Sequence, residues 1–200
     1  MKALVLALLI CSGSVFGQKI DNYFPLQNVQ MKYQICVDGR TAKERGLNKE
    51  TWWLDKPWVE NYRYEGIQLA CVKRNFIGDE IVEIQVLFEV RKDGVFEIGS
   101  GGGILQNNYQ KHNNPYPLLK YPIKLKKPWS YGDGKKTTYE VVEKLNSCIV
   151  DNTEYEDVIK VKITINDGGS IHTWAIFYAN GVGRIKEEFD GKIGVYLISE

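Results

Sequence analysis

Two segments of the chain alternate between apolar and polar residues and predict half-buried β-strands. They are residues 81–90 and 156–165, in which one face is apolar and the other is mostly charged. Asn166 to Gly169 follow the second segment and tolerate positive φ, and a further apolar run occupies 171–179, so we expect a β-hairpin here. The residues predicted to face inward are Val82, Ile84, Val86, Phe88 and Val90 in the first segment and Ile159, Val161, Ile163 and Ile165 in the second.

Shorter runs of the same kind recur along the chain, separated by turn pairs such as Asp93-Gly94 and Asn180-Gly181. One segment, 41–51, has helical composition, although Gly46 lies in its middle. The pattern predicts a single all-β domain of antiparallel strands that forms a curved open barrel or a sandwich, with at most one short helix. The additional strands are expected at 30–37, 58–64, 66–74, 94–98, 121–126, 137–149, 182–188 and 192–198.

Two segments interrupt the strand pattern. Gly99 to Gly103 indicates a flexible link or a bulge, and the Asn-, Tyr- and Pro-rich residues 106–117 predict a long surface connection. A phosphate-binding reading of the glycine run is disfavoured, because Ile104 stands at the sixth position and no helical pattern follows. Lys124, Lys126 and Lys127 alternate with apolar residues and are interpreted as the solvated face of a strand rather than as an anion patch.

The first 17 residues have the pattern of a secretory signal peptide. Lys2 supplies the positive charge, Ala3 to Ile10 form the apolar core, and Val15 and Gly17 fit a cleavage site. A lipoprotein alternative at Cys11 is disfavoured by the bulky Ile10 that precedes it. We therefore expect cleavage near Gly17, export to the periplasm or beyond, and a mature domain, 18–200, without a membrane-spanning segment.

Composition narrows the classes of partner. Lys and Arg total 26 against 25 Asp and Glu, a net charge of +1, which argues against nucleic-acid binding. Export would expose the three mature cysteines to oxidising conditions. If two of them pair, we expect Cys36 and Cys71, which lie in strand-like runs, with Cys148 left over. The alternative is that all three are small buried side chains.

The densest aromatic segment suggests a ligand site. Trp52, Trp53, Trp58 and Tyr62 fall within eleven residues and are the candidate ligand-binding residues, as a stacking platform or the rim of an apolar pocket. The alternative is a core plug that closes one end of the sheet.

Catalytic and metal-binding chemistry is not indicated. The chain has two histidines, His112 and His172, and no nucleophile elbow or zinc-type spacing, so no catalytic residue, metal or cofactor is predicted. Carboxylates cluster at Glu154–Asp157 and Glu187–Glu188, but both clusters flank strands and are interpreted as solvated. A hydrolase would require one of the histidines to lie near both an acid and a hydroxyl or thiol.

The C-terminal half resembles a known type of sequence. Residues 118–189 contain Pro128-Trp129, the strand 156–161 and the run Trp174 to Lys186, which reads W-x-x-x-Y-A-x-G-V-G-x-I-K. This resembles a group of exported bacterial β-rich proteins and lipoproteins of unassigned function. The resemblance implies export and a β-fold and carries over no catalytic residue.

These observations lead to one functional expectation and two alternatives. We expect an exported, non-enzymatic, envelope-associated protein that holds an apolar or lipid-like ligand in a concave sheet face. The first alternative is a structural or adhesion-type surface protein that acts through contacts with envelope proteins, and the second is a hydrolase.

Overall fold

A computed structural model describes residues 23–24, 29–37, 40–41, 49–55, 67–75, 81–102, 110–131 and 136–197. The all-β expectation is confirmed for these residues, which contain strands and no helix. The strands are β1 (Val29–Val37), β2 (Arg40–Thr41), β3 (Lys49–Asp55), β4 (Ile67–Asn75), β5 (Ile81–Arg91), β6 (Gly94–Gly102), β7 (Gln110–Lys120), β8 (Trp129–Tyr131), β9 (Lys136–Val150), β10 (Thr153–Asp167), β11 (Ser170–Ala179), β12 (Gly183–Phe189) and β13 (Lys192–Leu197).

The strands pair in the order β7-β6-β5-β4-β3-β1-β13-β12-β11-β10-β9-β8, with β2 paired separately to β1. Every neighbouring pair in this path is antiparallel, and most neighbours are also consecutive in the chain. The exception is β1, which pairs with β3 on one side and with β13 on the other. The sheet therefore has β7 and β8 as its two edges among the described strands.

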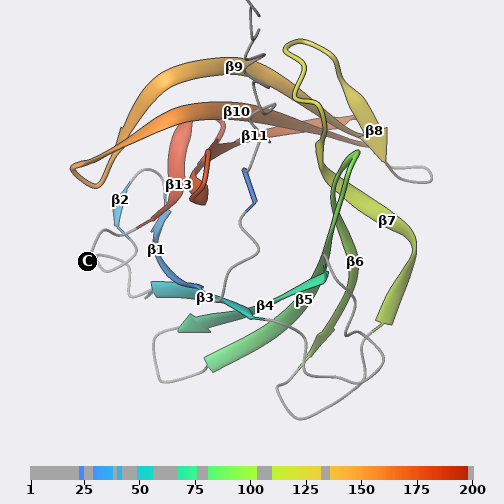
Figure 1. Ribbon diagram of the computed structural model, residues 1–200, viewed down its shortest axis with the longest axis horizontal. Coiled ribbons are helices and arrows are strands. Elements are labelled where there is room, and N and C mark those ends of the chain that lie inside the picture. The colour runs from blue at the N-terminus through green and yellow to red at the C-terminus, as the bar shows by residue number, and fades with distance from the viewer. Residues whose placement is uncertain are drawn as a thin grey trace, which may run out of the picture.

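The sheet curls until those edges lie side by side (Figure 1). Register shifts interrupt the ladders within β5–β6, β6–β7, β11–β12 and β12–β13. Such irregularities increase the local twist and bend a sheet. The path of backbone pairing nevertheless ends at β7 and at β8, so the ring is an open barrel.

Side chains along β10 alternate between the concave face and the outer face of the sheet. Val161 and Ile163 are buried on the concave face, whereas Lys162 is exposed on the outer face. The partner strand keeps this arrangement, because Val161 is opposite Ile176 and Lys160 is opposite Phe177. The alternation predicted from the sequence is thus the alternation between the inside and the outside of the barrel.

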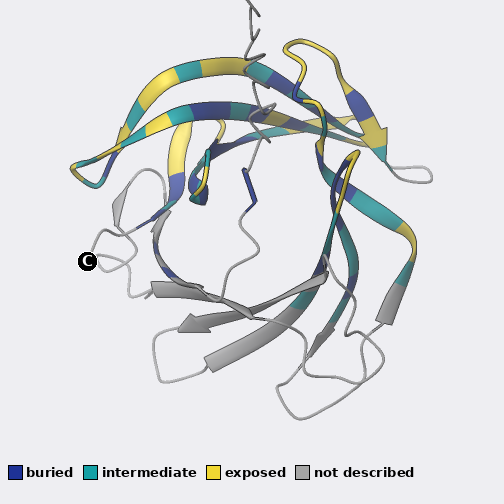
Figure 2. Cartoon of the chain, in the orientation of Figure 1, coloured by how far each residue is buried: buried dark blue, intermediate teal, exposed yellow. Residues whose placement is uncertain are grey.

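The short segment Tyr23–Phe24 lies within the ring and is buried (Figures 1 and 2). The Tyr23 hydroxyl donates a hydrogen bond of 2.8 Å to Asp157 on β10. The Phe24 ring packs edge-on against Phe88 of β5, with centroids 5.0 Å apart. The segment therefore bridges two distant parts of the wall and fills part of the space that they enclose.

The predicted hairpin at 156–179 is confirmed as β10 and β11, joined by Gly168 and Gly169 at positive φ. Gly99 to Gly102 of the glycine run belong to β6, and a register shift between Glu97 and Gly99 lies where the run begins. The predicted strand at 58–64 and residues 1–17 lie outside the described residues. Among those that are described, no helix has the length and apolar character needed to cross a membrane.

Three expectations of local structure are wrong. Residues 110–117 are not a surface connection but the first part of β7, an edge strand, where prolines are tolerated because one side of the backbone needs no partner. Residues 121–126 are not a strand but a loop that makes a single bridge, from Leu125 to Val141. The ends of the expected helix, Thr41 and 49–51, belong to β2 and β3.

Candidate functional site

The predicted aromatic site lies at the margin of the described structure. Trp52 and Trp53 are in β3, opposite Met31 and Gln30 of β1. Trp58 and Tyr62 lie outside the described residues, as do the side chains of the two β3 tryptophans. Their role in ligand binding stays a prediction.

The strand register places Cys36 and Cys71, the two cysteines of the expected disulfide, far apart along the sheet. Cys71 is opposite Trp53, which is opposite Gln30, and Cys36 lies six positions farther along β1. This offset is about 20 Å along the strands, whereas the Cα atoms of a disulfide lie about 4.4–6.8 Å apart. Pairing of Cys36 with Cys71 would thus need another register, and it stays a prediction that the mass of the oxidised chain can test. Cys148 is a half-buried thiol on β9.

The edges of the barrel meet at a seam that is held by side chains. The Trp129 indole on β8 donates a hydrogen bond of 2.8 Å to the carbonyl oxygen of Pro117 on β7. The rings of Tyr116 and Tyr131 cross the same gap with centroids 4.2 Å apart. No backbone ladder joins these two described strands. The seam is therefore the part of the wall that can separate without breaking a strand pair.

An acid–imidazole pair lies beside the seam on the neighbouring strands. His112 Nε2 of β7 is 3.1 Å from Glu97 Oε1 of β6, and the His112 ring packs against Tyr116 at 4.4 Å. Burial raises the pKa of the Glu97 carboxyl, and the hydrogen bond with His112 offsets part of that increase. The pair thus holds an ionisable carboxyl in a place that favours its protonated form.

Tyr139 on β9 connects this pair to the aromatic side of the seam. Its ring stacks on Trp129 with centroids 5.7 Å apart and planes within 7° of parallel. Burial, together with the negative charge of Glu97 and the neighbouring Tyr116, raises the pKa of Tyr139 to about 12. The phenol therefore stays protonated. The seam cluster consists of Glu97, His112, Tyr116, Trp129, Tyr131 and Tyr139.

A second set of polar groups is buried on the concave face near β12. Arg184 lies over the Tyr33 ring, 4.1 Å from its centroid, and forms a 2.5 Å ion pair with Glu187. The fully buried Tyr33 donates its hydroxyl proton to the Arg184 carbonyl oxygen at 2.9 Å. Burial also raises the pKa of nearby Tyr178, with a further contribution from Glu187. The concave face therefore offers aromatic surface combined with paired polar groups.

The histidines were the sequence candidates for hydrolytic chemistry. His112 meets an acid, Glu97, but its other described contact is the Tyr116 ring rather than a hydroxyl or thiol nucleophile. His172 is exposed on β11. In the part of the chain that the structure describes, no three His, Cys, Asp or Glu side chains are grouped as a metal site would require.

Comparison of the chain with protein-family models, with curated proteins and with solved structures gives no match.

Sequence reasoning missed the seam cluster because it assigned 106–117 to a loop. Tyr116, Tyr121, Trp129 and Tyr131 fall within sixteen residues, a second aromatic concentration comparable to the one at Trp52–Tyr62. This concentration of aromatic residues was the one feature of the sequence that could have indicated the seam cluster. The pairing of Glu97 with His112 had no signal, because it depends on the register of β6 with β7.

Proposed function

We propose that the protein is an exported, non-enzymatic binding protein of the cell envelope that holds an apolar or lipid-like ligand on the concave face of its barrel. The observation that carries the proposal is the seam between β7 and β8, which is joined by the Trp129–Pro117 hydrogen bond and by ring contacts instead of a ladder. An opening at this seam costs side-chain contacts only, and it would give a ligand a lateral route to the interior.

The chemistry of the concave face supports a ligand that is mainly apolar with a few polar atoms. Aromatic and aliphatic side chains dominate this face, and ligand sites are usually apolar surfaces with a small number of well-placed polar groups. Arg184 and Tyr139 are polar groups of that kind. The resemblance of residues 118–189 to exported β-rich proteins, and the signal-peptide pattern of 1–17, support the location.

The proposal is tested by native mass spectrometry of the protein purified from an envelope fraction without detergent. We expect an added mass of lipid size, in constant proportion between preparations. A spectrum that contains only the mass of the polypeptide, before and after incubation with a mixed lipid extract, would rule out a carried ligand.

Surface adsorption is separated from interior binding by matched variants. Ile149 on β9 and Ile171 on β11 expose 71% and 68% of their surface and pair with opposite ends of β10. Ile149→Ser and Ile171→Ser should keep the added mass unchanged. Its loss in either variant would show that the lipid adheres to exposed side chains instead.

A structural or adhesion role is the second candidate, and one observation favours it. Phe189 and Ile193, at the turn between β12 and β13, expose 47% and 41% of their surface. Large apolar side chains that are exposed at one turn are candidates for a contact surface. If this turn is a contact, Phe189→Ser should abolish cross-linking to an envelope protein and leave any bound lipid in place.

A further inference from the structure

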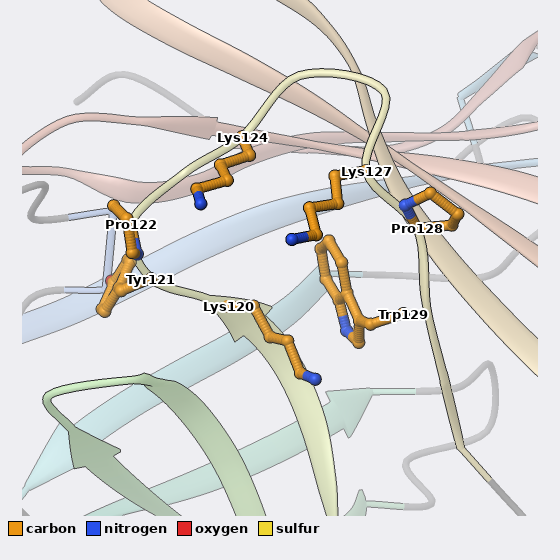
Figure 3. Close-up of a pocket in the computed structure, with 7 residues that line it drawn as sticks. All are labelled: Lys120, Tyr121, Pro122, Lys124, Lys127, Pro128 and Trp129. Atoms are coloured by element: carbon orange, nitrogen blue, oxygen red, sulfur yellow. The ribbon is translucent and has the colours of Figure 1, made fainter.

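A pocket of about 200 Å³ lies in the loop between β7 and β8, above the outer end of the seam (Figure 3). Lys124 and Lys127 extend from two arms of the loop toward the same space, whereas the side chain of Lys120, at the end of β7, runs away from them. The remaining walls are apolar or aromatic. The lining residues are Lys120, Tyr121, Pro122, Lys124, Lys127, Pro128 and Trp129.

The loop that carries the lysines is fixed to the barrel at several points. The Tyr121 amide donates to the Asp93 carbonyl oxygen and the Lys126 amide donates to the Val141 carbonyl oxygen, both at 2.8 Å. Between them, Ile123 is buried in the core. Trp129 closes the loop through its bond to Pro117. The lysine stems thus start from a fixed backbone, which lowers the entropy lost when a ligand is bound.

The charge of the pocket is not balanced by its own surroundings. None of the seven lining residues is acidic. None of the three lysines forms an ion pair with another described residue, whereas Lys160 and Lys186 on the outer face share Glu188. Like charges gathered around one concavity attract a multiply charged anion, for which the ammonium groups are point-charge donors.

We propose that this pocket binds a phosphate monoester, with the phosphate between Lys124 and Lys127 and the group that carries it against Pro122, Pro128 and Trp129. A phosphate monoester is nearly dianionic at neutral pH and has three strong acceptor oxygens, to which the ammonium groups of Lys124 and Lys127 can donate. The prolines and the indole supply an apolar wall that an isolated inorganic anion would leave unused. The site does not depend on a ligand inside the barrel.

The experiment is a calorimetric titration of the full mature chain with phenyl phosphate, with inorganic phosphate and phenol as reference probes. We expect saturable binding of phenyl phosphate that weakens with added salt, weaker binding of inorganic phosphate, and none of phenol. Lys124→Gln and Lys127→Gln should each lower the affinity about tenfold, which corresponds to the loss of one charge-assisted hydrogen bond.

The matched control is Lys162→Gln, an exposed lysine on the outer face of β10 that removes the same charge. It should leave the affinity for phenyl phosphate unchanged. The proposal is overturned if the unmodified protein shows no saturable binding, or if Lys162→Gln weakens binding as much as Lys124→Gln does.

The phosphate can belong to a soluble molecule or to a lipid headgroup, and co-sedimentation with vesicles distinguishes them. Vesicles of phosphatidylcholine with phosphatidic acid are compared with vesicles of phosphatidylcholine alone. Binding to the first that Lys127→Gln abolishes identifies a headgroup site. Binding of phenyl phosphate without co-sedimentation identifies a soluble phosphate monoester.

Discussion

Two carboxyl groups of this barrel have pKa values displaced in opposite directions. Glu97 lies at the seam, where its described partner is His112 and burial raises its pKa. Glu188 lies on the outer face between Lys160 and Lys186, at 3.1 and 2.8 Å. Burial there also opposes ionisation, but the hydrogen bonds from the two lysines outweigh it and lower the pKa.

The exposed fraction of the side chain alone does not explain this difference. The Glu188 side chain is 16% exposed and that of Glu97 is 24% exposed, although the Glu97 carboxyl lies deeper among protein atoms. Glu188 is covered by the two lysine chains themselves, which also pack over the Phe177 ring at 4.8 and 4.0 Å. Glu97 is hydrogen-bonded to a single imidazole, His112, and lies deeper among protein atoms. The depth of a carboxyl and the charge of the groups around it together decide which protonation state the fold favours.

The largest expected effect concerns one buried ring in each region, Trp129 at the seam and Phe177 on the outer face. Trp129→Ala removes a buried indole, its stacking on Tyr139 and its bond to Pro117, and should destabilise the fold by roughly 3–5 kcal/mol. Phe177→Ala should lie at the lower end of that range, because the flexible lysine stems above it can collapse into the space. Urea unfolding of both variants measures the difference. An equal loss at the two sites would mean that the outer cover is as rigid as the seam.

The next effect is the pH dependence that Glu97 contributes. Its pKa is higher in the folded protein than in the unfolded chain, so stability falls as the pH rises from about 4.5 toward the raised value. Glu97→Gln should remove that fall, whereas His112→Leu should extend it to higher pH, because the hydrogen bond that lowers the Glu97 pKa is lost. Unfolding free energies across this pH range test both. A Glu97→Gln profile parallel to that of the unmodified protein would contradict the assignment.

The smallest effect is expected at Glu188. Its lowered pKa stabilises the fold above the unfolded value of about 4.5, and this contribution is lost as the pH falls through the folded pKa. Glu188→Gln should cost about 0.5–1 kcal/mol at neutral pH, as partly exposed ion pairs do, and added salt should reduce the cost. Glu154→Gln, an exposed change on β10, serves as the control. Equal losses in the two variants would show that the lysine contacts contribute nothing.

The sequence predicts the two regions unequally. The alternation in 156–165 identifies which β10 residues face inward and which outward, and Asn166 to Gly169 locate the hairpin turn. The period of two is a local property and survives folding wherever one face is buried. The outer-face lysines could therefore be placed from the sequence, although their shared contact with Glu188 could not.

The seam could not be predicted from the sequence, because it depends on which strands form the edges of the folded sheet and on how the sheet curls. Pro115 and Pro117 argue against a strand, yet an edge strand accepts them, and nothing local indicates that 110–120 is an edge. The contact of Tyr116 with Tyr131 exists only because the whole sheet curls. Similarly, the interpretation of Lys124 and Lys127 as a strand face failed because the loop is shaped by bonds to Asp93 and Val141, residues distant in sequence.

The pairing of β1 with β13 has a consequence for how the barrel is assembled. Tyr33 on β1 is opposite Leu197 on β13. The pairing of β1, which is synthesised early, can therefore be completed only after β13 has been synthesised. Contacts of such high sequence separation raise the contact order and slow folding. Until β13 is available, β1 has an unpaired edge. The sheet is therefore complete only once β13 has been synthesised and has paired with β1.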